Sequence, residues 1–212
     1  VVDKMSVEAI AAAFEKYHAI YKGPPPEGEE PSEEQITAIK ALIDTLRPPT
    51  GDYSILRPFP YRHIRNHFFS GLVLMAGGKW RKVELKGPPN INVWCESYVI
   101  NKNILIMLDA VTLYILENYL RQIVEWAHRY GPKAWALIYQ ADSRMRNERM
   151  IRIRRRGARL LKEAQDSGNP CEYDEARPWN WVWKEAMGEY EMNHFWRPQL
   201  TEPAHMIASG AI

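Results

Sequence analysis

The chain has 212 residues, 46% of them hydrophobic and 25% charged, which is the composition of a folded globular protein with a substantial core. Its longest uninterrupted apolar run, residues 104–108, is far shorter than the roughly 18 residues of a membrane span, and two cysteines are too few for a disulfide framework or a cysteine-rich metal site. The formal net charge of +2 excludes a uniformly basic or acidic protein, and we expect an intracellular protein, cytoplasmic or within an intracellular particle, with packed thiols and no membrane partner.

The first predicted element is a helix that is capped by Ser6 and ends at Gly23. Residues 23–31 (GPPPEGEEP) cannot continue a helix and lack apolar residues to pack, so they predict a semi-rigid linker. We therefore expect residues 1–30 to form an arm that docks elsewhere, with another subunit as one candidate. The candidate interface residues of this arm are Phe14, Tyr17, Tyr21, Glu29 and Glu30.

The body begins with a predicted helix over residues 33–46, whose N-terminus carries a capping box of Ser32 and Gln35. A short helix is expected within residues 57–69. Two β-prone runs that flank residues 76–79 (AGGK) then predict a single β-hairpin near residues 70–86. Because a two-stranded ribbon is only marginally stable alone, this hairpin must lean on helices or on a neighbouring chain.

The rest of the chain predicts further helices. We expect a mostly buried helix over about residues 91–108, a second between Thr112 and Gly131, and a third that starts at Pro132 and continues to Gly168. Two short helices follow, around WNWVWKEAM and QLTEPAHMI. The predicted fold is therefore mainly α, a multi-helix bundle with one long basic helix and one hairpin. It is divided into the N-terminal arm and linker (1–30), a helical core domain (31–168) and a Trp-rich C-terminal helical segment (169–212).

The long helix carries most of the positive charge. Residues 143–162 contain nine basic residues and one acid, so the rest of the chain sums to 2 − 8 = −6. Arginines 149, 152, 156 and 159 follow at spacings of 3, 4 and 3 and share a face, next to an apolar face that includes Ile153. The pattern predicts a packed helix with an arginine-rich outer side. The candidate nucleic-acid-binding residues are Arg146, Arg149, Arg152, Arg154, Arg155, Arg156, Arg159 and Lys162.

Two interpretations of this charge stay open. Arginine forks fit phosphate oxygens, and each neutralised phosphate releases counterions, which indicates sequence-independent binding of RNA or another polyanion. The alternative is a solvated face neutralised by acids elsewhere, and the five glutamates of residues 27–34 are an available partner within the chain or between subunits. Membrane-surface binding is disfavoured because the core uses the apolar face.

No arrangement of catalytic residues stands out. His63 and His67 have metal-like i,i+4 spacing, but residue 64 is isoleucine and no third ligand is near, so we expect a surface histidine pair. Asp142 is expected to be partly buried in a structural salt bridge with Arg146 rather than to act in catalysis. We therefore predict that the protein is not an enzyme and has no catalytic residues, metal, cofactor or small-molecule substrate.

Trp179, Trp181 and Trp183 alternate along one predicted helix and cannot all share one of its faces. We expect two of them to pack inward and one to be exposed at an interface, with Trp181 as the candidate. A wholly buried cluster is the alternative.

The chain contains a series of distinctive strings, each once: GPPN followed by tryptophan, LDAV, YGPKAWALIYQADSRMR, RPWNWVW, and FW followed by EP. With these strings, residues 31–207 resemble the gag-like region of retroelement polyproteins from dinoflagellate-type protist genomes. The resemblance implies a capsid or nucleoprotein role, in which copies self-associate and hold the element's RNA. It also implies that Arg146 through Lys162 face phosphates and that residues 1–30 exchange between subunits.

The function that we predict is thus a structural, self-associating gag-like protein that binds nucleic acid without sequence specificity. Its partners would be other copies of itself and RNA or another polyanion. The alternative is a non-catalytic structural subunit of a larger heteromeric or ribonucleoprotein complex, which predicts a monomer that co-purifies with unlike chains. A monomeric enzyme is the third class.

Overall fold

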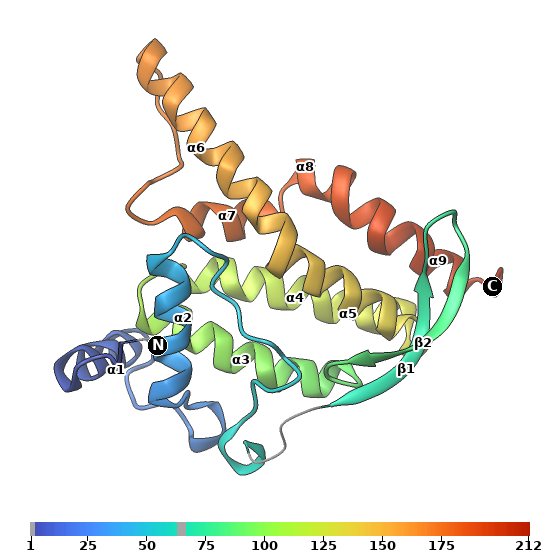
Figure 1. Cartoon of the computed structure of the whole chain (residues 1–212), viewed down its shortest axis with the longest axis horizontal. Coiled ribbons are helices and arrows are strands. Elements are labelled where there is room, and N and C mark those ends of the chain that lie inside the picture. Colours follow the sequence, from blue (N-terminus) through green and yellow to red (C-terminus); the bar gives the residue numbers. More distant parts are fainter. Residues whose placement is uncertain (1–2, 63–66) are drawn as a thin grey trace.

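A computed structural model describes residues 3–62 and 67–212, and within them the fold is mainly α with one antiparallel hairpin (Figure 1). In chain order the elements are α1 (Val7–Tyr21), α2 (Glu33–Asp44), β1 (Phe68–Leu74), β2 (Trp80–Lys86), α3 (Ile91–Met107), α4 (Leu113–Tyr130), α5 (Trp135–Arg144), α6 (Met150–Ser167), α7 (Pro178–Ala186), α8 (Glu189–Glu191) and α9 (Glu202–Ala208). Two π-helical segments, Met145–Arg149 and Met192–Thr201, join α5 to α6 and α8 to α9. The predicted fold class and hairpin position are confirmed.

Helix α3 is the buried centre of the molecule, between α1 and α4 (Figure 1). Four consecutive residues, 104–107, are buried, so this part of α3 has no solvent face. Its two buried amides are satisfied. The Asn101 side chain accepts a hydrogen bond from the backbone N–H of Gly51 at 2.9 Å, and the Asn103 amide donates to the carbonyl of Glu29 at 2.8 Å. These bonds attach the loops around α2 to α3.

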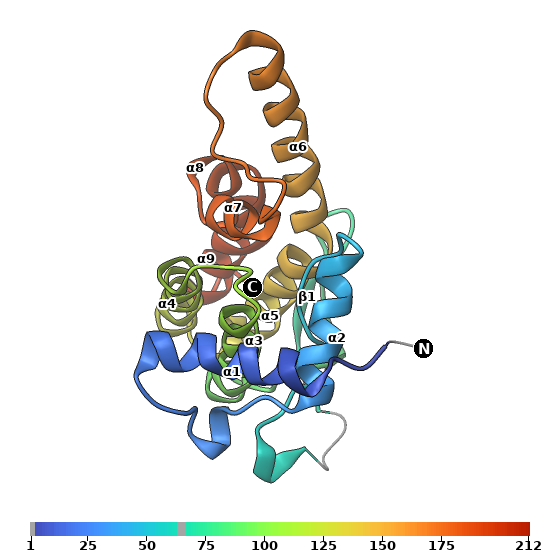
Figure 2. The same ribbon diagram turned by 90° about the vertical axis from the view of Figure 1, so that its left-hand side faces the viewer.

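Helix α1 docks on α3 of its own chain, so the predicted arm is part of the body (Figure 2). Ser6 caps it as predicted, and Ile10, Ala13 and Tyr17, at spacings of 3 and 4, form its buried face. The linker is packed rather than free, because Pro25 is buried and Glu29 is bonded to α3. The prediction that residues 23–31 have nothing to pack was therefore wrong.

The predicted interface residues of the arm are divided between the core and the surface. Tyr17 is only 4% exposed, and Phe14 packs half-buried against the core. Tyr17 is therefore a core residue, and its assignment to an intersubunit interface is corrected. Tyr21 lies at the edge, stacked on Tyr17 with ring centroids 4.4 Å apart. Glu29 and Glu30 are exposed, although the carbonyl of Glu30 accepts a hydrogen bond from Arg62.

The hairpin pairs Phe68 with Lys86 at its open end and Leu74 with Trp80 next to the turn. It lies on α5, which provides the helical support that the sequence required. Gly71 makes this close approach possible, because a Cβ atom there would lie 2.2 Å from the Cβ of Ala136. Of the short helix expected before the hairpin, the structure shows a single 3-10 turn at Phe59–Tyr61, and residues 63–66 lie outside the described residues.

The predicted long helix is nearly continuous through α5, the π-helical segment and α6, and it ends at Gly168 with a left-handed φ of 73°. The second half of α6 extends beyond the body of the molecule, and the chain returns beside it to α7 (Figures 1 and 2). The first half of α6 is anchored on α7. A Cβ atom on Gly157 would lie 2.4 Å from the ring of Tyr173 and 2.8 Å from that of Trp181.

One hydrophobic cluster contains side chains from all three predicted segments, among them Ile10, Ile104 and Trp183. The division of the chain at residues 30 and 168 stays a prediction. Among the described residues, every helix is too short or too polar to cross a bilayer.

Candidate polyanion-binding surface

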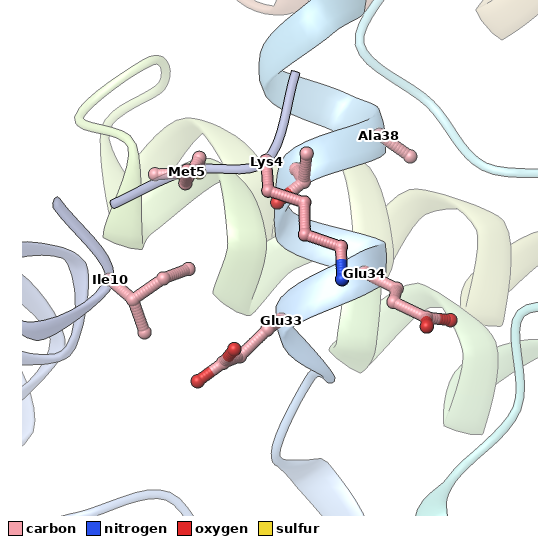
Figure 3. A pocket seen from close by; sticks show the side chains of 7 residues that line it. Lys4, Met5, Ile10, Glu33, Glu34 and Ala38 are labelled. Atoms are coloured by element: carbon pink, nitrogen blue, oxygen red, sulfur yellow. The ribbon is translucent and has the colours of Figure 1, made fainter. Parts of the chain in front are cut away.

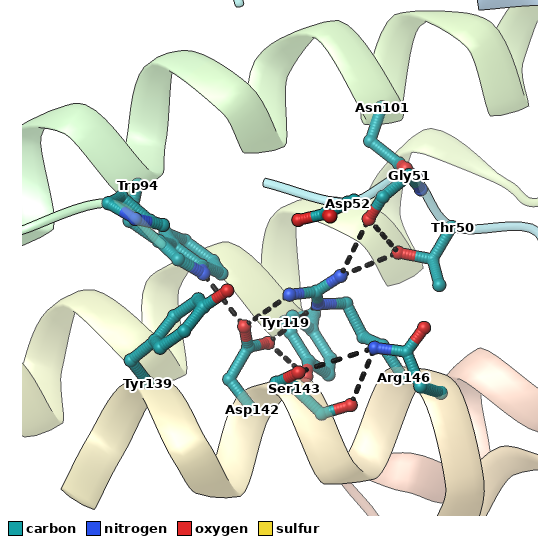
Figure 4. A network of polar contacts seen from close by, with 12 residues as sticks. Thr50, Gly51, Asp52, Trp94, Asn101, Tyr119, Tyr139, Asp142, Ser143 and Arg146 are labelled. Carbon is teal, nitrogen blue, oxygen red and sulfur yellow. Dashed lines mark hydrogen bonds and ion pairs between the residues drawn. The ribbon is translucent and has the colours of Figure 1, made fainter. Parts of the chain in front are cut away.

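The basic segment begins with a buried ion pair between Asp142, near the end of α5, and Arg146, in the π-helical segment that follows. Asp142 and Arg146 are 0% and 1% exposed, and Nε and Nη2 of Arg146 donate to the Asp142 carboxylate at 3.0 and 2.8 Å (Figure 4). The Trp94 indole and the Tyr119 hydroxyl donate to the same carboxylate at 2.8 and 2.7 Å, and Arg146 Nη1 donates to Thr50 Oγ1 at 2.6 Å. The predicted salt bridge is confirmed. The prediction that Arg146 faces a phosphate was wrong, because its guanidinium is enclosed and satisfied.

Aromatic rings enclose this ion pair. The guanidinium carbon of Arg146 lies 3.7 Å from the centre of the Tyr53 ring. Burial raises the pKa of the Tyr53, Tyr98 and Tyr119 hydroxyls. Burial alone would lower the pKa of Arg146, but the adjacent Asp142 carboxylate holds that pKa above its ordinary value. The two charges are therefore paired with each other inside the core.

The next two positions on the inner side of the helix pair with acids from the C-terminal segment. Arg149 donates from Nε to the carboxylate of Glu191 at 2.7 Å. Arg156 donates to Glu191 at 3.2 Å and to Glu185 at 3.4 Å. Glu191 is 0% exposed, whereas the two arginine side chains are 19% and 21% exposed. Arg149 and Arg156 thus attach α6 to α7 and α8, and most of their charge is already compensated.

The outer side of α6 differs. Four exposed cations follow at spacings of 3, 4 and 3, and we call them the outer stripe: Arg152, Arg155, Arg159 and Lys162. At 1.5 Å per residue they span about 15 Å along the helix. Arg159 lies 3.8 Å from Glu163, with both side chains about two-thirds exposed. In the part of the chain that the structure describes, the other three have no carboxylate within ion-pairing distance.

Arg154 lies on another side of α6, half-buried, with a buried Nε that has no hydrogen-bond partner among the described residues. The glutamates of residues 27–34 do not neutralise the basic helix. The carboxylates that pair with α6 and the π-helical segment before it belong to Asp142, Glu163, Glu185 and Glu191. The intramolecular partner expected from the sequence is therefore corrected to these four acids.

A hollow of about 350 Å³ lies between the start of α6 and the C-terminal π-helical segment. We call it the arginine hollow, and its lining residues are Arg144, Glu148, Arg149, Arg152, His194, Phe195 and Gln199. Arg144 Nη1 donates to the side-chain oxygen of Gln199 at 2.8 Å, so its charge faces a neutral partner. Arg152 belongs both to this hollow and to the outer stripe, and the two features are continuous.

Neither this hollow nor the pairing of Arg149 with Glu191 was predicted from the sequence. His194 and Glu191 are 45 and 42 residues from Arg149, and no spacing rule connects positions so far apart. The only signal is composition, because acids and aromatic residues alternate in EAMGEYEMNHF after the tryptophan cluster. Such a string predicts a partly buried segment, but it does not show which helix covers it.

The three tryptophans of α7 are all buried, at 1%, 9% and 0% exposure for Trp179, Trp181 and Trp183. Trp181 packs edge-on to Tyr173 at 5.6 Å, and Trp183 packs edge-on to Tyr119 at 5.0 Å. The expectation that Trp181 is exposed at an interface was wrong, because α6 and α4 cover different sides of α7.

A second hollow, of about 340 Å³, lies where the N-terminal residues cross α2 (Figure 3). Lys4 extends over the first turn of α2 near Glu33 and Glu34, and Met5 and Ile10 form the apolar side. The two glutamates lie in the first turn of α2, where they complement the positive end of the helix dipole.

The structure gives no geometry for a predicted His63–His67 pair, because His63 lies outside the described residues. Among the residues that are described, no three His, Cys, Asp or Glu side chains gather in a way that could hold a metal ion. Cys95 and Cys171 are free thiols that pack half-buried against the core, as expected, and burial raises the pKa of Cys95 to about 11.

Comparison with known proteins returns no family model, no curated protein and no solved structure that matches this chain significantly, so the gag-like resemblance stays a prediction.

Proposed function

We propose that this chain is a structural protein that binds nucleic acid without sequence specificity through the outer stripe, and that its copies assemble on that polymer. The observation that carries the proposal is a row of four exposed cations on a helix that extends beyond the body of the molecule (Figure 1). Three of the four have no ion-pair partner in the described part of the chain. The stripe is therefore available to an external polyanion.

The energetics favour an external partner. Like charges at i,i+3 and i,i+4 repel by a few tenths of a kcal/mol per pair, and the outer stripe contains three such neighbouring pairs. Each phosphate that these cations neutralise relieves that repulsion and releases condensed counterions. Guanidinium groups also form paired hydrogen bonds to phosphate oxygens. The stripe contacts a backbone in this way without reading bases, so the proposed binding is independent of sequence.

The assembly half of the proposal is supported by the gag-like resemblance and by exposed apolar side chains. Val7 on α1, Tyr114 on α4 and Leu160 on α6 are 82%, 73% and 39% exposed. Leu160 lies on the same helix as the outer stripe, so contacts between copies and with the polymer would be adjacent. The arm is docked on its own chain, so we do not assign the assembly to exchange of residues 1–30.

The test replaces Arg152, Arg155, Arg159 and Lys162 with glutamine and measures binding of labelled single-stranded oligonucleotides against salt concentration. Each lost phosphate contact flattens the slope of log K against log salt by about 0.7, so four contacts give a change of about 3. The matched control replaces Lys79, Arg81, Lys82 and Lys133, which are exposed elsewhere. Both variants have a formal net charge of 2 − 4 = −2.

An unchanged slope in the outer-stripe variant, or an equal loss in the control, contradicts the proposed binding surface. Light scattering of the wild-type chain with and without RNA tests the assembly half. We expect a mass of several copies that increases when RNA is added. A monomer under both conditions contradicts assembly and supports the alternative of a subunit that requires unlike partner chains.

A further inference from the structure

We propose that the arginine hollow seats one nucleotide of a single-stranded nucleic acid, with its phosphate on Arg144 and Arg152 and its base against His194. This inference rests on the proposed function and narrows its ligand to single strands. Arg152 lines the arginine hollow and is also the first cation of the outer stripe. A backbone that follows the stripe from Lys162 to Arg152 therefore enters the hollow without leaving the cationic surface.

Two of the three arginines of the hollow, Arg144 and Arg149, are held in place before any ligand binds. Arg144 is fixed by Gln199 at 2.8 Å, a neutral partner that leaves its positive charge uncompensated. Arg149 is fixed by the buried Glu191 and lies at the inner wall. Glu148 is the single acid that lines the hollow, against three arginines. A phosphate is thus attracted to the Arg144–Arg152 side, and of these two side chains only the exposed Arg152 has still to be ordered on binding.

His194 lines the hollow and belongs to a stack of three planar groups, of which the other two, Tyr190 and Arg156, are not among its lining residues. The Arg156 guanidinium carbon lies 4.4 Å from the centre of the Tyr190 ring. The rings of Tyr190 and His194 are stacked 4.1 Å apart with an interplanar angle of 18°. His194 is exposed and Nδ1 of its ring donates to the carbonyl of Tyr190 at 2.8 Å, which fixes the ring in this orientation.

This stack is the reason why we propose a single-stranded ligand rather than a duplex. A base that enters the hollow continues the series from Arg156 through Tyr190 to His194. In a duplex both faces of each base are covered by neighbouring base pairs, whereas an unpaired base offers its face to an aromatic side chain. Basic tracks with adjacent aromatic rings are typical of proteins that bind single strands without sequence preference. The hollow volume of about 350 Å³ is within the range of sites that bind small ligands.

The test compares single-stranded poly-dT and poly-U oligonucleotides with a blunt DNA duplex of equal length, using fluorescence anisotropy at fixed salt. Replacement of His194 with alanine removes the stacking surface, so we expect roughly tenfold weaker single-strand binding and less than about twofold change for the duplex. His194→Phe keeps a ring at this position and should retain single-strand affinity within about twofold. The matched control is His128→Ala, an exposed histidine on α4 outside the hollow.

Arg144→Gln gives a second, independent measurement, because it removes a phosphate contact of the hollow that the outer stripe does not contain. We expect a several-fold loss that is larger for the single strand than for the duplex. Equal affinities for single strand and duplex in wild type, or no effect of His194→Ala and Arg144→Gln, overturn this inference while the outer-stripe result stands. If the outer-stripe variant also binds like wild type, the proposed function itself fails.

Discussion

Arg146 and Arg155 lie nine residues apart on one nearly continuous helical path, but their surroundings are opposite. The Arg146 guanidinium is 1% exposed, bonded to Asp142 and Thr50, and covered by the ring of Tyr53. Arg155 is exposed on the outer side of α6, with no carboxylate within ion-pairing distance among the described residues. Arg149 and Arg156 are intermediate, since Glu191 and Glu185 pair with them.

The difference shows that an arginine-rich run is not one functional unit. At the α5 end the charge stabilises the contact between the core and the loop before the hairpin. In the middle it attaches the C-terminal segment. On the outer stripe only Arg159 has an ion-pair partner among the described residues, so most of this charge is available to a partner. Substitutions in the buried, the paired and the exposed part of the run should therefore have separable effects on stability and on binding.

The largest effect is expected from Arg146→Gln, because it leaves the Asp142 carboxylate buried without its ion-pair partner. The free energy of unfolding should fall by about 3–5 kcal/mol, measured by urea denaturation. Asp142 keeps hydrogen bonds from Trp94 and Tyr119, which places the loss toward the lower end of that range. A decrease of less than about 1 kcal/mol in the free energy of unfolding would contradict the view that the Asp142–Arg146 ion pair stabilises the fold.

A smaller effect is expected from Glu191→Gln, which removes a buried acid that accepts hydrogen bonds from two arginines. The free energy of unfolding should fall by about 2 kcal/mol. At the same time Arg149 and Arg156 lose their counter-charge, so the affinity for single-stranded oligonucleotides should rise and the salt slope should steepen. Denaturation and anisotropy on the same protein measure both changes.

The matched control for that variant is Glu189→Gln, an exposed glutamate two residues earlier on the same helix. It removes the same charge without breaking an ion pair among the described residues, so stability and salt slope should stay close to wild type. If Glu189→Gln raises the affinity as much as Glu191→Gln, the gain comes from net charge and not from release of the two arginines.

The smallest effect on stability is expected from Arg155→Gln. Its neighbours Arg152 and Arg159 lie three and four residues away, so its removal relieves like-charge repulsion. The free energy of unfolding should stay unchanged or rise by a few tenths of a kcal/mol, while polyanion binding weakens. Urea denaturation of this variant alongside Arg146→Gln tests the prediction. A decrease of more than about 1 kcal/mol in the free energy of unfolding would show that Arg155 stabilises the fold.

Much of the fold follows from local pattern. Ser6 and Asn90 cap α1 and α3 as their side chains predict, Gly168 ends α6, and the glycine turn after β1 forms the hairpin. The predicted Asp142–Arg146 pair is confirmed because its partners lie one helical turn apart. Each of these features depends on residues close in sequence, where capping, turn chemistry and i,i+4 spacing are decisive.

The errors concern contacts between distant segments. The tryptophans of α7 alternate in a way that suggested one exposed ring, but helices cover several sides of α7 and bury all three. Residues 23–31 were expected to have nothing to pack, but Pro25 is buried and the carbonyl of Glu29 accepts a hydrogen bond from Asn103. The glutamates near α2 were a predicted partner of the basic helix, but its counter-charges come from Asp142 and Glu163 on the same helical path and from Glu185 and Glu191 in the C-terminal segment.

By itself, the sequence determined the helices, the hairpin and the position of the basic run, because helix periodicity, caps and turns act over a few residues. Only the tertiary structure decided which cations are buried, paired or free, and it alone brought His194 and Tyr190 beside Arg149 and Arg156. The physical reason is that burial and ion pairing depend on what packs across a face, and the packing partners lie dozens of residues away in the chain.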